Sequence, residues 1–150
     1  MNFALGFETG STISLSDADA DGLPDAWENL YGLSTSDNGS INIDNGPNGD
    51  PDHDGIANII EWLVGLNPKL VDNSAYPKVA IAKIAGGFRL NFPTLPGRKY
   101  QLQSSATLNV WDPFGAPLVT APTDPPGTFQ IDDTTSLPKR FYRMVITAAP

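Results

Sequence analysis

The sequence predicts a mainly β protein with a small α part, in which two short loop–helix units precede an antiparallel β-sandwich. Two acid-rich segments, residues 17–28 and 50–61, share one spacing, and each runs into a short apolar stretch with helical character. After residue 76, five segments alternate apolar and polar residues, which is typical of strands. The chain of 150 residues also holds 14 glycines and 14 prolines, a composition that favours many turns over long helices.

Negative charge is concentrated in the first half of the chain. Residues 1–75 hold 13 of the 17 acidic residues and a single basic residue, Lys69, whereas residues 76–150 hold four acids and eight bases. Nine of the 17 acids lie in the two acid-rich segments. We therefore expect no nucleic-acid partner. The sequence has no apolar run of about 18 residues, so no membrane span is expected either.

Each acid-rich segment carries oxygen-bearing side chains at positions 1, 3, 5, 9 and 12, with glycine at position 6. Calcium takes six to eight oxygen ligands, and a 12-residue loop supplies them from these positions and from the carbonyl of position 7. Glycine permits the sharp turn at position 6. The sequence therefore predicts two calcium ions (Ca²⁺). The predicted ligands are Asp17, Asp19, Asp21, the Leu23 carbonyl, Asp25 and Glu28 in the first loop, and Asp50, Asp52, Asp54, the Ile56 carbonyl, Asn58 and Glu61 in the second.

A pair of acidic turns that begin helices is the alternative interpretation of these segments. It would leave several carboxylates crowded together without a cation, which is electrostatically costly. Asp37 and Asp44 match no ligand pattern, and we interpret them as turn formers.

A short helix is expected after each loop. Pro24 suits a first helical turn, and Gly32 and Gly65 lie where a left-handed cap would end each helix. The segments that precede the loops are strand-like or turn-rich, so the fold is predicted as two calcium loop–helix half-EF-hand units. We expect a small shared core from Trp27, Leu30, Tyr31, Ile59, Ile60, Trp62, Leu63 and Val64.

The pattern D-x-D-x-D-G-[LI]-x-[DN]-x-x-E-x-x-x-G-L resembles the bacterial thrombospondin type 3 repeat, and it is similar to dockerin, which pairs two such units. Either resemblance covers about residues 17 to 68. Both imply a secreted or cell-surface protein, since calcium is abundant outside cells. The dockerin resemblance also implies a protein partner.

The second half of the chain is predicted to be the β-sandwich. Candidate strands are separated by the turn sequences AGG, LPG, DPFGAP, TDPPG and SLP, and residues 69–77 read as a linker. We therefore predict two domains, 1–75 and 76–150. The sequence after Gly87 loosely resembles immunoglobulin-like fibronectin type III domains, and the N-terminal FALGF could complete the sandwich. The predicted strands are residues 78–84, 87–92, 99–104, 128–132 and 140–146.

No pairing of a nucleophile with a base is evident, because the chain has one histidine and no cysteine. The adjacent acids Asp132 and Asp133 should point to opposite faces of a strand, and a strand-end turn explains them. We therefore predict a non-catalytic, calcium-binding accessory or structural region of a larger secreted or cell-surface bacterial protein, and expect a monomer. The alternative is a carbohydrate-binding or protein-docking module. Its sugar-stacking candidates include Tyr100, Trp111 and Tyr142, which could equally be core residues.

Overall fold

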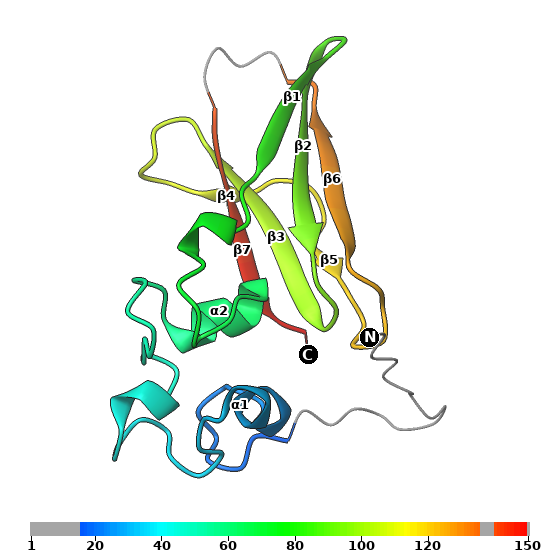
Figure 1. The fold of residues 1–150 in the computed structure, drawn as a ribbon. Coiled ribbons are helices and arrows are strands. Elements are labelled where there is room, and N and C mark those ends of the chain that lie inside the picture. Colours follow the sequence, from blue (N-terminus) through cyan, green and yellow to red (C-terminus); the bar gives the residue numbers. More distant parts are fainter. Residues whose placement is uncertain (1–15, 136–139, 150) are drawn as a thin grey trace.

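The computed structural model describes residues 16–135 and 140–149. As predicted, the fold is mainly β, with 31% strand and 15% helix. The helices lie together at one end of the molecule and the strands form the other end (Figure 1). Within the described residues, no helix is long and apolar enough to cross a membrane. The described α-helices are α1 (Asp25–Tyr31) and α2 (Asn58–Val64), and the described 3₁₀ helices are η1 (Ile43–Asn45) and η2 (Asn73–Ala75). The described strands are β1 (Ala80–Ile84), β2 (Gly87–Thr94), β3 (Arg98–Ser105), β4 (Asp112–Pro113), β5 (Leu118–Val119), β6 (Gly127–Asp133) and β7 (Phe141–Ala148).

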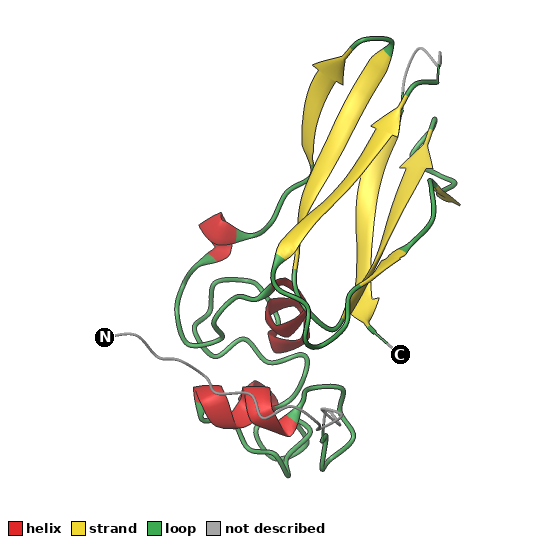
Figure 2. Ribbon diagram, turned by 90° about the vertical axis from the view of Figure 1, so that its right-hand side faces the viewer, coloured by secondary structure: helices red, strands yellow, loops and turns green. Residues whose placement is uncertain are grey.

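The described strands form two antiparallel sheets that pack face to face (Figure 2). One sheet has the order β1-β2-β6, and in the other β3 pairs with β4, β5 and β7. Alternation along the strands turns one set of apolar side chains inward. The resulting core joins Leu90, Phe92 and Phe129 of the first sheet to Tyr100 and Leu102 of the second. The predicted antiparallel sandwich is therefore present.

The five predicted strands correspond to β1, β2, β3, β6 and β7, with boundaries that differ by one or two residues. The interpretation of residues 112–117 as a turn alone was wrong, because β4 lies inside this segment and pairs with Gln103 and Ser104. A two-residue strand has no alternation for a sequence pattern to detect. The segment FALGF lies outside the described residues.

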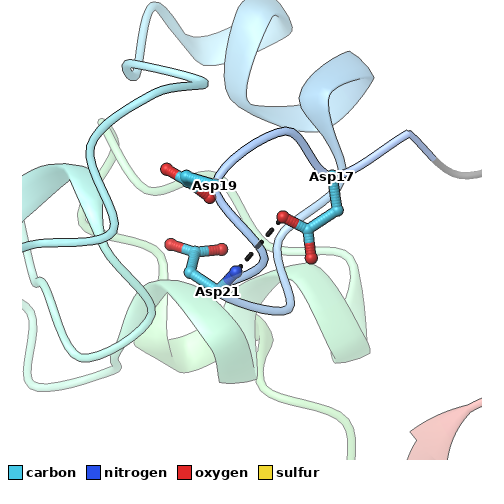
Figure 3. Close-up of side chains that lie close together, drawn as sticks. All are labelled: Asp17, Asp19 and Asp21. Atoms are coloured by element: carbon cyan, nitrogen blue, oxygen red, sulfur yellow. Dashed lines mark hydrogen bonds between the residues drawn. The ribbon is translucent and has the colours of Figure 1, made fainter.

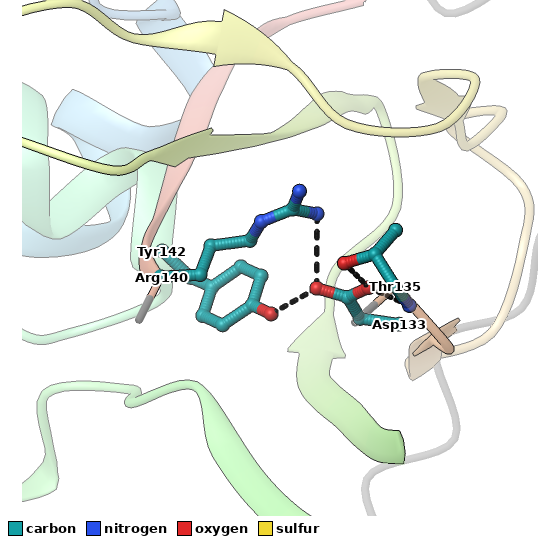
Figure 4. Close-up of polar contacts among 4 residues, drawn as sticks. All are labelled: Asp133, Thr135, Arg140 and Tyr142. Atoms are coloured by element: carbon teal, nitrogen blue, oxygen red, sulfur yellow. Dashed lines mark hydrogen bonds and ion pairs between the residues drawn. The ribbon is translucent and has the colours of Figure 1, made fainter. Parts of the chain in front are cut away.

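Asp133 connects the two sheets (Figure 4). Its buried carboxylate accepts hydrogen bonds from the Tyr142 hydroxyl, from Arg140 Nη1 (3.0 Å) and from the backbone N–H of Thr135 (2.8 Å). Asp132 lies on the opposite face of β6 and forms a bidentate ion pair with Arg89, in which both hydrogen bonds are 2.8 Å long. The two acids do point to opposite faces, as expected, although both belong to the strand itself.

Arg98 joins the sandwich to the second loop–helix unit. Its guanidinium donates to the carbonyls of Trp62 (2.6 Å) and Leu63 (3.2 Å), and Cζ lies 4.3 Å from the centre of the Trp62 ring. The last carbonyls of a helix lack partners within the helix and carry partial negative charge. A cation from β3 therefore caps the C-terminus of α2.

The core of the loop–helix units differs from the predicted one. Leu30 is 72% exposed and Ile60 is 36% exposed, so these two residues are not core residues. Each helix has only seven residues, and the residues that flank it supply much of the buried apolar surface. Besides Trp62, the buried apolar residues in the described part of this half include Leu23, Leu33, Leu66 and Pro68.

Gly32 and Gly65 end the two helices in the left-handed conformation, as the sequence predicted (φ 68° and 79°). The N–H of Leu33 then donates to the Glu28 carbonyl (2.8 Å), and that of Leu66 donates to the Glu61 carbonyl (2.9 Å). This cap turns the leucine that follows the glycine back against the helix. These caps also hold the backbone carbonyls of Glu28 and Glu61 in place.

Candidate metal centres

The two acid-rich loops have the same backbone conformation. Their fourth residues, Ala20 and His53, and their sixth, Gly22 and Gly55, all have positive φ (59°, 63°, 96° and 91°). The predicted glycine turn is therefore present in both loops. The left-handed fourth residue was not predicted, because alanine gives no signal for it and a single histidine gives only a weak one.

The first aspartate of each loop organises the turn. Asp17 accepts hydrogen bonds from the N–H groups of the fifth and sixth loop residues (3.2 and 2.9 Å), and Asp50 accepts the equivalent pair (3.2 and 3.0 Å). In each case the fifth residue, Asp21 or Asp54, accepts from the N–H two residues further on (2.8 and 2.9 Å). These bonds curl the chain so that the three aspartates of a loop face a common space.

Three carboxylates converge in each loop. Ligand oxygens of Asp17, Asp19 and Asp21 all lie within 4.8 Å of one another (Figure 3), and the same holds for the aspartates at 50, 52 and 54. These side chains are half-buried. Both oxygens of Asp19 are buried without a hydrogen-bond partner among the described residues. Such an arrangement can hold a metal ion.

Within the described residues, Glu28 and Glu61 are buried carboxylates without partners. Both are 0% exposed, and neither carboxylate oxygen of either residue has a hydrogen-bond partner among the described residues. Burial, followed by the nearby charge of Asp19, raises the pKa of Glu28 to about 7. Burial and the charge of Asp52 likewise raise the pKa of Glu61 to about 7. A buried, unpaired carboxylate is costly in its ionised form, so each glutamate favours either protonation or a positive partner.

The residues at loop position 9 have a different environment. Asp25 accepts hydrogen bonds from the Ser16 hydroxyl and from the Ala18 N–H (2.8 Å), and these two bonds lower its pKa. Asp25 therefore connects the ninth position of loop one to the start of the loop. Asn58 donates through Nδ2 to the Asp44 and Gly46 carbonyls (2.9 and 2.8 Å), while its buried Oδ1 has no partner among the described residues.

The carbonyls of Leu23 and Ile56 remain predicted ligands. Leu23 is fully buried beneath loop one, and its N–H donates to Asp21 (2.8 Å). Ile56 is half-buried, and its N–H donates to Asp54 (2.9 Å). Both backbones are therefore held against the fifth aspartate of their own loop.

The structure adds a carboxylate that sequence reasoning missed. Asp72, which was placed in a linker, lies with Asp54 and Glu61 so that ligand oxygens of all three are within 4.8 Å of one another. It is 18 residues from Asp54 and matches no position of the loop pattern, so nothing in the sequence identifies it. Asp37, by contrast, is a turn former as predicted: it accepts from the N–H groups of Ile41 and Asn42 (3.0 Å each).

All of these groups offer oxygen. Carboxylate and carbonyl oxygens suit hard divalent cations such as calcium and magnesium, whereas zinc and copper prefer sites with nitrogen or sulfur. His53 is exposed at the fourth position of loop two. The chemistry that these clusters can perform is therefore the binding of a hard cation.

The sandwich has a shallow depression on its surface. It is lined by Pro96, Pro122, Thr123, Asp124 and Pro125. Its one carboxylate, Asp124, accepts a hydrogen bond from the Ala121 N–H (2.7 Å). The depression therefore lacks the pair of acids that glycoside hydrolysis requires.

Comparison with protein-family models, with curated proteins and with solved structures finds no match. The resemblance of the loops to thrombospondin type 3 repeats and to dockerin, and that of the sandwich to fibronectin type III domains, therefore stay predictions.

Proposed function

We propose that this chain is a non-catalytic, calcium-binding accessory region of a larger secreted or cell-surface bacterial protein, and that each acid-rich loop binds one Ca²⁺ ion. The observation that carries the proposal is the pair of fully buried glutamates, Glu28 and Glu61, whose oxygens have no hydrogen-bond partner among the described residues. The charges of the loop aspartates act on each glutamate, that of Asp19 most strongly on Glu28 and that of Asp52 on Glu61, so a cation held by the loop would offset these charges together.

Calcium fits this donor set better than magnesium does. Calcium accepts six to eight oxygens in a flexible shell and tolerates a bidentate carboxylate, whereas magnesium demands a tight octahedron and keeps several waters. The loops offer many carboxylates on curved backbone, with a buried glutamate that can use both oxygens. Calcium is near millimolar outside cells, which supports the secreted or surface location.

The ions would act as structural elements. Isolated helices shorter than about 12 residues are marginal in water, and α1 and α2 have seven residues each. A cation held by the loop and by the closing glutamate would fix each helix to its loop. At a calcium concentration about 100 times the dissociation constant, each ion would add about 2.7 kcal/mol to the free energy of unfolding.

The β-sandwich is proposed as a spacer. Tyr100 is 1% exposed, which removes it from any sugar-stacking surface, and Trp111 is half-buried with Arg143 Cζ 4.5 Å from its ring centre. The buried Tyr100 hydroxyl accepts the Leu95 N–H (2.6 Å), as expected of a core residue.

Calorimetry tests the proposal. The chelator-treated chain, titrated with calcium chloride, should bind two ions, and magnesium should bind more weakly. Glu28→Gln and Glu61→Gln should each weaken one site, while Asp112→Asn, which changes an exposed carboxylate on β4, should weaken neither. A stoichiometry of zero, or a preference for magnesium, would refute the proposal.

A further inference from the structure

We infer that Asp72 is a ligand of the cation in loop two, so that the second site, unlike the first, takes a carboxylate from the segment that leads into the β-sandwich. This inference rests on the proposed function and extends its second site.

Asp72 is held in place with one oxygen free. Its Oδ2 accepts the N–H of Asn67 (3.2 Å), and its own N–H donates to Asp54 Oδ2 (3.1 Å). Asn73 Nδ2 donates to the Asp54 carbonyl (3.0 Å), which fastens the same segment to the loop. The remaining oxygen, Asp72 Oδ1, is buried and has no hydrogen-bond partner among the described residues.

Glu61 is the independent sign that a ligand belongs at this point. It is fully buried, and both of its oxygens lack partners among the described residues, yet ligand oxygens of Asp54, Glu61 and Asp72 lie within 4.8 Å of one another. Three carboxylates that approach so closely repel one another strongly when they are ionised. A cation among them removes the repulsion and satisfies the free oxygens.

Within residues 16–135 and 140–149, loop one has no counterpart to Asp72. Among the described residues, the carboxylates that converge on loop one are its own aspartates, 17, 19 and 21. Asp37 follows the first helix much as Asp72 follows the second, but its oxygens accept from Ile41, Asn42 and Asn45 within its own turn. The two sites are therefore unequal, although the loop sequences match.

The extra carboxylate has two consequences. Calcium affinity in such loops rises with the charge and number of the ligands, so Asp72 should make site two bind calcium more tightly than the loop's own ligands alone would. The ion would also hold the chain that runs from Asn67 to η2, directly before β1. Since Arg98 already fastens α2 to β3, calcium at site two would join the loop–helix unit to the sandwich at a second point.

The test uses the full chain in a background where only site two remains. We expect Glu28→Gln to bind one calcium ion, and the double variant Glu28→Gln/Asp72→Asn to bind it about tenfold or more weakly. Asparagine keeps the size and the acceptor oxygen while it removes the charge. Glu28→Gln/Asp112→Asn is the matched control and should bind as Glu28→Gln does.

Hydrogen exchange gives a second measurement that needs no change at Asp72. In Glu28→Gln, calcium should increase the protection of amides 67–75, whereas in Glu61→Gln it should not. Equal calcium affinity with and without Asp72→Asn, or no calcium-dependent protection of amides 67–75 in Glu28→Gln, would overturn the role of Asp72 alone. A wild-type chain that binds no calcium would overturn the proposed function and this inference together.

Discussion

At the scale of single residues, Glu28 and Glu61 are placed by backbone chemistry. Each lies at the fourth position of a seven-residue helix, and its carbonyl is held by the glycine cap that ends the helix. The backbone therefore places the side chain in a buried position next to its loop, although burial disfavours the ionised carboxylate. Substitutions of these two glutamates should therefore respond strongly to the presence of a cation.

Replacing either glutamate by glutamine should lower stability in calcium but not in chelator. In chelator at pH 8, above the raised pKa of about 7, the substitution removes a buried, unpaired charge and should raise the melting temperature or leave it unchanged. In calcium it removes a ligand, and stability should fall by up to about 2.7 kcal/mol. Thermal melts with Asp112→Asn as control check this. Destabilisation of equal size in both conditions would show that the glutamates merely pack.

The pKa of Asp133 indicates how the stability of the sandwich should depend on pH. Burial alone would raise its pKa, but hydrogen bonds from Thr135 and Tyr142 and the charge of Arg140 hold the pKa below its ordinary value. Because the folded-state pKa is depressed, the stabilisation is present above the unfolded value, near 3.9, and is lost as pH falls through the folded value.

Unfolding of the wild-type sandwich should therefore become easier below about pH 4. Asp133→Asn should lose about 1–3 kcal/mol at pH 7, since it leaves Arg140 and Tyr142 poorly paired, and should show a weaker acid dependence. Urea unfolding at pH 3 and at pH 7 measures both effects. The exposed pair Arg89–Asp132 provides the control, for which Asp132→Asn should cost under about 1 kcal/mol.

At the scale of elements, α2 is stabilised from outside by β3. Arg98→Met should keep the apolar stem of the side chain but remove two hydrogen bonds to helix carbonyls and the contact with the Trp62 ring. We expect a loss of about 2 kcal/mol in the free energy of unfolding. Arg98→Lys should recover only part of it, because an ammonium cannot reach both carbonyls as the planar fork does. Urea unfolding of wild type, Arg98→Lys and Arg98→Met measures these differences in the free energy of unfolding. A loss of less than about 0.5 kcal/mol for Arg98→Met would contradict a stabilising role of Arg98.

The elements that could be predicted are those with a local signal. Alternation identified the five longer strands, and glycine followed by leucine marked the ends of both helices. The two-residue strands β4 and β5 were missed, because each pairs with β3 only through the tertiary fold. Leu30 was wrongly assigned to the core, since on a two-turn helix the sequence does not determine which face packs.

In the candidate site, too, the features with a local sequence signal could be predicted and those formed by long-range contacts could not. The convergence of the three aspartates in each loop could be predicted, since their spacing is set by the geometry of one loop. The role of Glu28 and Glu61 as ligands stays a prediction. Asp72 could not be predicted, because it reaches Asp54 only after the chain has turned back through Asn67. Long-range contacts of this kind leave no periodicity in the sequence.

At the scale of the whole molecule, we expect the loop–helix half and the sandwich to differ in stability. The sandwich has its own core and the Asp133 network, whereas the loop–helix half has few large buried apolar residues and most of the negative charge. Without calcium, repulsion among the clustered carboxylates should loosen residues 17–68 while the sandwich stays folded.

Limited proteolysis can separate these regions. Chymotrypsin has sites at Trp27, Tyr31 and Trp62, so in chelator it should cleave within residues 17–68 first, about tenfold or more faster than in calcium, because cleavage follows the population of the opened state. Trypsin is the matched control: Lys69 is the one basic residue of the first 75, so trypsin reports mainly on the rest of the chain, and its cleavage of the sandwich should not depend on calcium. Equal chymotrypsin rates in both conditions would show that the loops are stable without the ion. Calcium-dependent trypsin cleavage within the sandwich would show that the two regions unfold as one.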